Sequence, residues 1–193
     1  IGCASLLDNT TGASNVAIGV ATLFDNTTAC NNTAVGSYSM IKNTTGTANV
    51  ALGTNALACN TTADNNTAIG FCSLRLNTTA QCNTAVGSGA LQANTDGAVG
   101  VALGFNALHR NTTGGANTAV GASALSYNIS GDNSVAIGFL AMECNQSGSS
   151  HAAVGRCALR SNTTANENTA VGFVALCANT TGGDNTAVGR GAL

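Results

Sequence analysis

The sequence predicts an all-β fold, a β-solenoid of about eleven stacked coils that share one 17-residue repeat. A glycine recurs at every seventeenth position from Gly2 to Gly189, and no insertion or deletion interrupts the series. The residues between these glycines repeat too, and the unit reads N-T-A-V-G-x-x-A-L-x-x-N-T-T-G-x-x. The chain has no Trp, no Pro and only 4% aromatic residues, so its interior must be narrow. A fixed short period is typical of solenoids, in which neighbouring coils supply the core.

We number the unit as positions 1 to 17, with Asn32 at position 1 and Ala48 at position 17. Positions 1 to 4 predict a short strand, because Thr or Val at position 2 and Val, Ile or Leu at position 4 flank an invariant Ala at position 3. The invariant Gly at position 5 predicts a corner that needs a positive φ or has no room for a Cβ. We expect the aliphatic residue of position 4 and the Leu or Met of position 9 to form two ridges inside the solenoid.

Positions 6 to 11 leave two alternatives open. They fit a second strand of a β-roll, and they also fit one short helical turn per coil, since the restricted positions 4, 8, 9 and 12 have the spacing of a helical face. Positions 12 to 15, N-T-T-G, predict a turn. Position 12 is Asn in every coil, from Asn9 to Asn179, and we expect these amides to form a ladder. Coils spaced like paired strands, at about 4.8 Å, make a rod roughly 50 Å long.

The domain organisation predicted is a single uninterrupted repeat array over residues 1–193. The first and last repeats are as regular as the middle ones and carry no polar cap. Because exposed solenoid ends need capping repeats, we expect this array to be a segment of a longer one.

Composition narrows the function. Only 7% of residues are charged and the formal net charge is −2, which gives no basic footprint for nucleic acid. No run of 18 apolar residues occurs, which predicts no membrane span. Scarce charge, abundant Asn, Thr, Ser and Gly, and eight Cys favour an extracellular location or a cell or virion surface.

The strand motifs carry a resemblance. "NVAIG" at 15–19, "NTAVG" at 32–36 and "NSVAIG" at 133–138 resemble the β-roll head repeats of trimeric autotransporter adhesins. The full 17-residue unit is more similar to the NTAIG-type repeats of phage tail-fibre shafts and of large microbial or viral surface proteins. The resemblance implies a shaft or a presenting surface. As the partner we expect further copies of the chain, through self-association into a filament or homo-oligomer.

No constellation of catalytic residues emerges from the sequence. His109 and His151 lie at positions 10 and 1, on different parts of the coil, and the eight carboxylates are scattered over the variable positions 10, 11, 14, 16 and 17. Metal ligation and acid–base catalysis need groups that converge on one point, and no phosphate-binding loop motif occurs. We therefore expect no enzyme activity, no cofactor and no metal site.

The cysteines predict two disulfides, Cys59–Cys72 and Cys144–Cys157. Each pair joins position 11 of one coil to position 7 of the next, and the same spacing occurs twice. In a helical turn these positions would share a face, which would bring neighbouring coils within disulfide reach. The alternative is free or differently paired thiols. Candidates for bonds between chains are Cys3, Cys30, Cys82 and Cys177.

The N-T-T-G turns also predict glycosylation. Ten of the eleven asparagines at position 12 head an N-x-[ST] sequon, the signature of N-glycan acceptors. The alternative is that Asn with Thr or Ser simply builds the same Asx-type turn. The candidate acceptors are Asn9, Asn26, Asn43, Asn60, Asn77, Asn111, Asn128, Asn145, Asn162 and Asn179.

Three function hypotheses follow. The leading one is a structural subunit of an extracellular fibre, filament or shaft without an active site. The second is an ice-binding solenoid, because the Thr residues of positions 2, 13 and 14 could present regular ranks. The third is an adhesin or tail-fibre segment.

Overall fold

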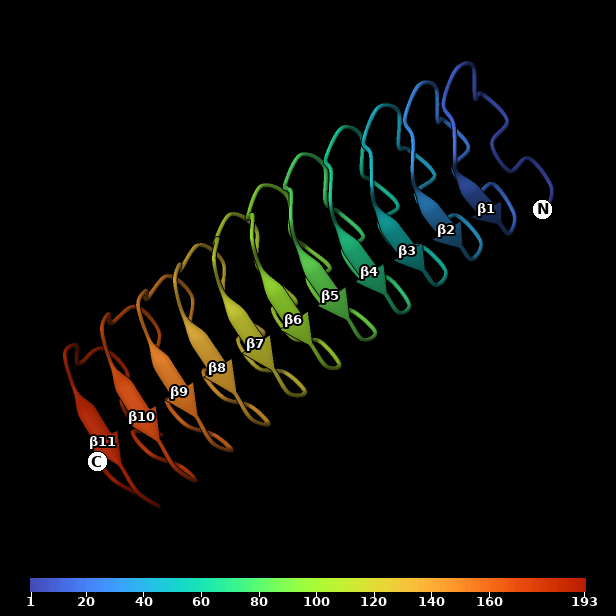
Figure 1. Ribbon diagram of the computed structural model, residues 1–193. Coiled ribbons are helices and arrows are strands. Elements are labelled where there is room, and N and C mark those ends of the chain that lie inside the picture. The colour runs from blue at the N-terminus through green and yellow to red at the C-terminus, as the bar shows by residue number, and fades with distance from the viewer.

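The computed structural model describes residues 1–193 and confirms a β-solenoid without any helix. Each coil contributes one three-residue strand, and the eleven strands stack side by side along the axis of the rod (Figure 1). The strands are β1 (Val16–Ile18), β2 (Thr33–Val35), β3 (Val50–Leu52), β4 (Thr67–Ile69), β5 (Thr84–Val86), β6 (Val101–Leu103), β7 (Thr118–Val120), β8 (Val135–Ile137), β9 (Ala152–Val154), β10 (Thr169–Val171) and β11 (Thr186–Val188). No helix in the structure is long and apolar enough to cross a membrane.

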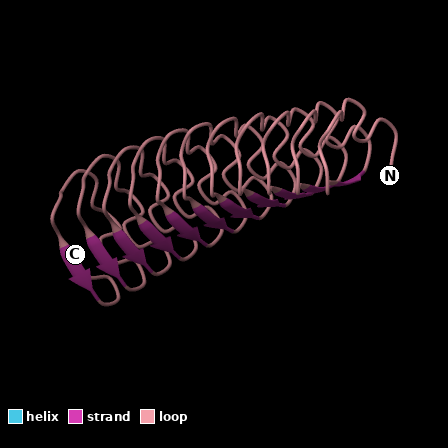
Figure 2. Cartoon of the chain, turned by 45° about the horizontal axis from the view of Figure 1, so that its top comes forward, coloured by secondary structure: helices cyan, strands magenta, loops and turns pink.

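The strands form one parallel sheet in sequence order, β1 to β11. Every pairing is in register, so that Ala102 of β6 lies beside Ala85 of β5 and Ala119 of β7. The sheet twists gradually along the rod, and in Figure 2 the strands turn from face-on near the C-terminus to edge-on near the N-terminus. Equivalent positions of all coils therefore lie in continuous ranks along the molecule.

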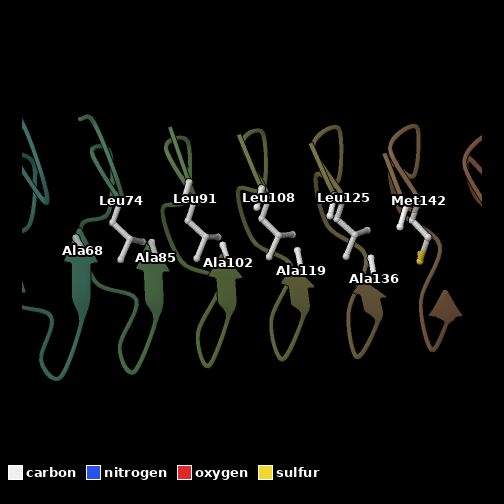
Figure 3. Close-up of a cluster of buried hydrophobic side chains, with 14 of the residues drawn as sticks. Ala68, Leu74, Ala85, Leu91, Ala102, Leu108, Ala119, Leu125, Ala136 and Met142 are labelled. Atoms are coloured by element: carbon white, nitrogen blue, oxygen red, sulfur yellow. The ribbon is translucent and has the colours of Figure 1, made fainter. Parts of the chain in front are cut away.

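The core consists of one large and two small side chains per coil. Leu108 at position 9 is fully buried, and Ala102 at position 3 and Ala107 at position 8 pack around it. In Figure 3 the labelled Leu and Met side chains lie along the rank of strand alanines, with Leu74 between Ala68 and Ala85. The narrow interior explains why the sequence uses Ala at position 3, because a larger side chain on the strand would have no room beneath this Leu rank.

Our expectation for position 4 was wrong. Position 4 residues such as Ile137 (40% exposed) and Leu103 (37% exposed) point outward. The strands show the reason, since Ala at position 3 is buried and successive side chains of a strand point to opposite faces. The core has one aliphatic ridge, at position 9, and the second ridge lies on the outer surface of the sheet.

The prediction of one short helical turn at positions 6 to 11 was also wrong. The alternative, a second strand of a β-roll, does not form there either. Asn106 at position 7 and Leu108 at position 9 have φ of 53° and 52°, and the same left-handed residues recur in each coil. A right-handed helix requires consecutive residues of one hand, so this pattern excludes it. The N–H groups bond to neighbouring coils instead, from Asn106 to the Ser88 carbonyl and from Leu108 to the Ala124 carbonyl, both at 3.0 Å.

Both reasons that the sequence suggested for the glycine at position 5, a positive φ and a lack of room for a Cβ, apply in the structure. Gly104 has a φ of 138°, a value that side-chain-bearing residues rarely adopt. A Cβ at Gly104 would also lie 2.7 Å from the carbonyl carbon of Gly121 in the next coil. The same glycine in every coil therefore allows the coils to approach closely at this edge of the strand.

Candidate functional site

The asparagines of position 12 form a continuous amide ladder inside the turn. Nδ2 of Asn111 donates to Oδ1 of Asn94 in the preceding coil and to the Gly114 carbonyl in its own coil, both at 2.8 Å. Oδ1 of Asn111 accepts from Nδ2 of Asn128 at 2.7 Å. Every asparagine of this rank donates to the one before it, from Asn26 to Asn179.

The ladder changes the interpretation of the sequons. Nδ2, the atom that would carry a glycan, is hydrogen-bonded in every asparagine of the rank, and the asparagines are buried except for the partly exposed Asn9 and Asn179. Asn94 is the one asparagine of the rank without a sequon, yet it makes the same two bonds, to Asn77 Oδ1 and the Gly97 carbonyl. The asparagine is kept where the sequon is lost, which favours a structural turn. Glycosylation stays a prediction, and it would have to displace the ladder.

Position 1 forms a second ladder, and His151 belongs to it. In most coils an Asn at this position accepts a backbone N–H of the next coil through Oδ1 and donates to a carbonyl through Nδ2. Asn49, for example, accepts the N–H of Asn66 and donates to the carbonyl of Ala63. His151 replaces that amide in its coil. Its Nδ1 accepts the N–H of Asn168 at 3.2 Å, which leaves the proton on Nε2, facing the carbonyl of Ala165. Burial lowers the pKa of His151, so the neutral ring is favoured at this site.

The carboxylates serve the stack as well. Oδ1 of Asp64 accepts the backbone N–H of Thr47 in the preceding coil at 2.6 Å, and Asp132 accepts that of Gly115 at 2.7 Å. Glu143 and Arg160 form an ion pair between neighbouring coils, with 2.7 Å between Oε2 and Nε. These acidic groups are thus distributed along the rod, and no three His, Cys, Asp or Glu side chains form a group that could hold a metal ion.

All eight cysteines are free thiols in the structure. The helical turn from which we inferred the disulfides is absent, but the proximity of positions 11 and 7 has other support. Arg110 and Ser123 occupy these positions in neighbouring coils, and they line the same hollow. The Cys59–Cys72 and Cys144–Cys157 bonds stay predictions for the oxidised protein.

One shallow hollow of about 270 Å³ lies on the face formed by positions 7, 10 and 11. Its lining includes His109, Arg110, Tyr127 and Glu143, with the Arg110 guanidinium stacked 4.7 Å from the centre of the Tyr127 ring. Nδ1 of His109 lies 3.1 Å from the Gly89 carbonyl, and no hydrogen bond joins His109 to the serines or to Glu143. The hollow is polar and open, and its residues do not form an acid–base or nucleophile pair.

The most distinctive surface is the outer side of the sheet, which we call the open sheet face. It comprises positions 2 and 4 of the strands together with the exposed residues of position 6, which follow the glycine corner, and positions 2 and 4 of all eleven strands carry only Thr, Ala, Val, Ile or Leu. At position 6 a Phe occurs in every second coil from Phe71 to Phe173, and all four are exposed: Phe71 (59%), Phe105 (58%), Phe139 (48%) and Phe173 (41%). Four of the five Phe residues of this aromatic-poor chain therefore lie in one exposed rank.

One arginine occupies a gap in the Phe rank, and another follows the last Phe. The Arg156 guanidinium lies 5.9 Å from the ring centre of Phe139 and 5.3 Å from that of Phe173, and Arg190 lies 5.7 Å from the Phe173 ring. These distances allow cation–π attraction. Sequence reasoning missed this face because it placed position 4 inside. The 34-residue spacing of the four Phe residues was the signal that could have revealed it.

No protein-family model matches the chain, and neither a curated protein nor a solved structure matches it.

Proposed function

We propose that this chain is a structural subunit of an extracellular fibre, filament or shaft. The observation that carries the proposal is that four of the strictly repeated positions, 3, 5, 9 and 12, hold one coil to the next. Position 12 supplies the amide ladder, positions 3 and 9 supply the core, and position 5 allows the close approach of the coils. A shaft needs a uniform cross-section along its length, and this arrangement provides one.

The rest of the surface is compatible with that role. The variable positions carry the few charges and the open hollow, and these features do not recur from coil to coil. An adhesin or tail-fibre segment is the specialised form of the same proposal, in which such a local feature on the rod contacts a receptor. The resemblance to fibre-shaft repeats supports an extracellular or virion-surface location.

Electron microscopy of the purified chain tests the proposal. We expect narrow rods or longer filaments whose width is uniform and whose axial repeat is about 4.8 Å, the strand spacing. Compact globular particles without that repeat would contradict the proposed role.

Ice binding is the second candidate, and one observation favours it. Six of the eleven position 2 residues of the strands are threonines on the open sheet face, and Val or Ala occupies this position in the other coils. The threonines are Thr33, Thr67, Thr84, Thr118, Thr169 and Thr186. The position 13 threonines do not contribute, because their hydroxyls donate to the next coil, as Thr112 does to the Ile129 carbonyl at 3.0 Å. A measurement of thermal hysteresis with the purified chain tests this function. Thermal hysteresis would support ice binding, and its absence at millimolar concentration would exclude it.

A further inference from the structure

We propose that the open sheet face binds a second copy of this chain, face to face and antiparallel, to form a twofold dimer. The inference rests on the proposed structural role, because it treats the chain as a rod with one uncovered side. The face carries no charged residue at positions 2 and 4, whereas the carboxylates lie at positions 10, 11, 14, 16 and 17. Depletion of charge and enrichment of exposed aromatic residues distinguish the centre of an interface from ordinary surface.

The size of the face suits a stable dimer. Eleven strands at about 4.8 Å and three ranks of side chains across the strand direction give a surface of roughly 50 Å by 13 Å per copy. Pairing two such faces would bury roughly 1,300 Å², within the range of specific interfaces and above that of most crystal contacts. The twist of the sheet, visible in Figure 2, is compatible with this contact, because two ribbons of the same twist can coil around a shared axis.

The Phe rank selects the antiparallel arrangement. In an antiparallel face-to-face pair each rank lies opposite the same rank of the other copy, whereas in a parallel pair position 6 would lie opposite position 2. Neighbouring Phe side chains are two coils apart, about 10 Å, so the gaps at Ser88 and Ala122 have room for a ring from the partner, whereas Arg156 fills the third gap. The rank is thus complementary to itself when shifted by one coil.

One register places all four Phe rings against small or aliphatic uncharged residues. A twofold axis between the coils of Gly87 and Gly104 sets Phe105 opposite Ser88, Phe71 opposite Ala122, Phe139 opposite Thr54 and Phe173 opposite Val20 of the other copy. The same axis sets position 4 aliphatic residues opposite one another, with Leu52 opposite Ile137 and Ile18 opposite Val171. Arg156 and Arg190 then lie opposite Ser37 and Cys3, so no two arginines meet.

Charge substitution on the face tests both the interface and its register. We expect the unaltered chain to have twice its monomer mass of 18.8 kDa by light scattering at micromolar concentration. Leu52→Lys should weaken dimerisation at least tenfold, because it places two charges against Ile137 in the apolar interface. Adding Ile137→Glu should restore the dimer, since each Lys then meets a Glu of the partner. Positions 52 and 137 lie five coils apart in one chain, so they cannot pair within it.

Two controls complete the test. Leu52→Lys with Val171→Glu has the same charges in a mismatched register and should remain monomeric, and Thr113→Lys on an exposed turn should leave the dimer intact. Circular dichroism of each variant confirms that it is folded. A monomeric unaltered chain, a dimer that tolerates Leu52→Lys, or equal rescue by Val171→Glu would each overturn the proposal. If the unaltered chain forms rod-shaped monomers, the dimer is excluded but the proposed shaft role is not affected. Globular particles in electron microscopy would contradict the shaft role itself.

Discussion

At the scale of single residues, Asn111 tests whether position 12 serves the ladder or the sequon. Asn111→Ala removes the donor to Asn94 Oδ1, the acceptor for Asn128 Nδ2, and the only side-chain donor to the Gly114 carbonyl. Buried groups left without a partner cost about 1–3 kcal/mol each, so we expect the free energy of unfolding to fall by about 3 kcal/mol or more. Denaturant unfolding measures this change.

The matched control removes the sequon and keeps the amide. Thr113→Ala destroys the acceptor signature at Asn111, and its side chain is exposed. We expect a change within about 0.5 kcal/mol, as is usual for surface substitutions. Equal losses from the two substitutions would contradict the ladder account.

His151 makes the stability of the solenoid depend on pH. Burial lowers its pKa below the ordinary 6.5, so the unfolded chain takes up the proton first as the pH falls. The free energy of unfolding should therefore be highest above about pH 6.5 and should decrease between pH 6.5 and the lower pKa of the folded state. Protonated Nδ1 could no longer accept the N–H of Asn168.

The variant His151→Asn restores the amide that most coils have at this position. We expect the loss of stability between pH 7 and pH 5 to become smaller in this variant, measured by denaturant unfolding at each pH. An unchanged pH profile would show that other groups control the titration.

At the scale of the coil, the stability of the fold should depend on how well the narrow core is filled. Both a smaller side chain at position 9 and a larger side chain at position 3 should destabilise it. Leu108→Ala opens a cavity in a fully buried site and should cost about 2–5 kcal/mol. Ala102→Leu overfills the same layer and should cost about 1–3 kcal/mol or more. Ile129→Thr, at an exposed turn where other coils have Thr, should change stability little. Thermal unfolding compares the three, and a tolerated Ala102→Leu would contradict the narrow core.

The predicted disulfides also belong to this scale, because each would join two neighbouring coils. We expect peptide mapping of the oxidised protein to show Cys59 linked to Cys72 and Cys144 linked to Cys157. Each bond closes a short loop and should stabilise the fold by about 2–3 kcal/mol over the reduced protein. Cys30→Ser is the control that should leave both links in place. Eight titratable thiols in the oxidised native protein would contradict the prediction.

The sequence was sufficient for the strand, the glycine corner, the turn and the asparagine ladder, because each depends on a residue type that has one strong local reason to occur there. It was insufficient for positions 6 to 11. Left-handed φ is intrinsically unfavourable at Asn106 and Leu108, and it is held by N–H bonds from Asn106 to the preceding coil and from Leu108 to the next. The direction of position 4 was missed because its restriction to aliphatic residues resembles that of a core position. The open sheet face exists only because the position 4 side chains point outward. It could therefore not be recognised from the sequence while position 4 was assigned to the core.

At the scale of the whole molecule, the central claim is that the chain is a rod built from interchangeable coils. Deleting residues 83–116 removes two complete coils and joins position 17 of one coil to position 1 of another, in phase. Small-angle X-ray scattering of the deleted chain should show the same cross-section and a maximum dimension shorter by about 10 Å. Deleting residues 83–112 instead breaks the phase and should destabilise the fold strongly. An in-phase deletion that unfolds the protein, or that leaves its length unchanged, would contradict the account.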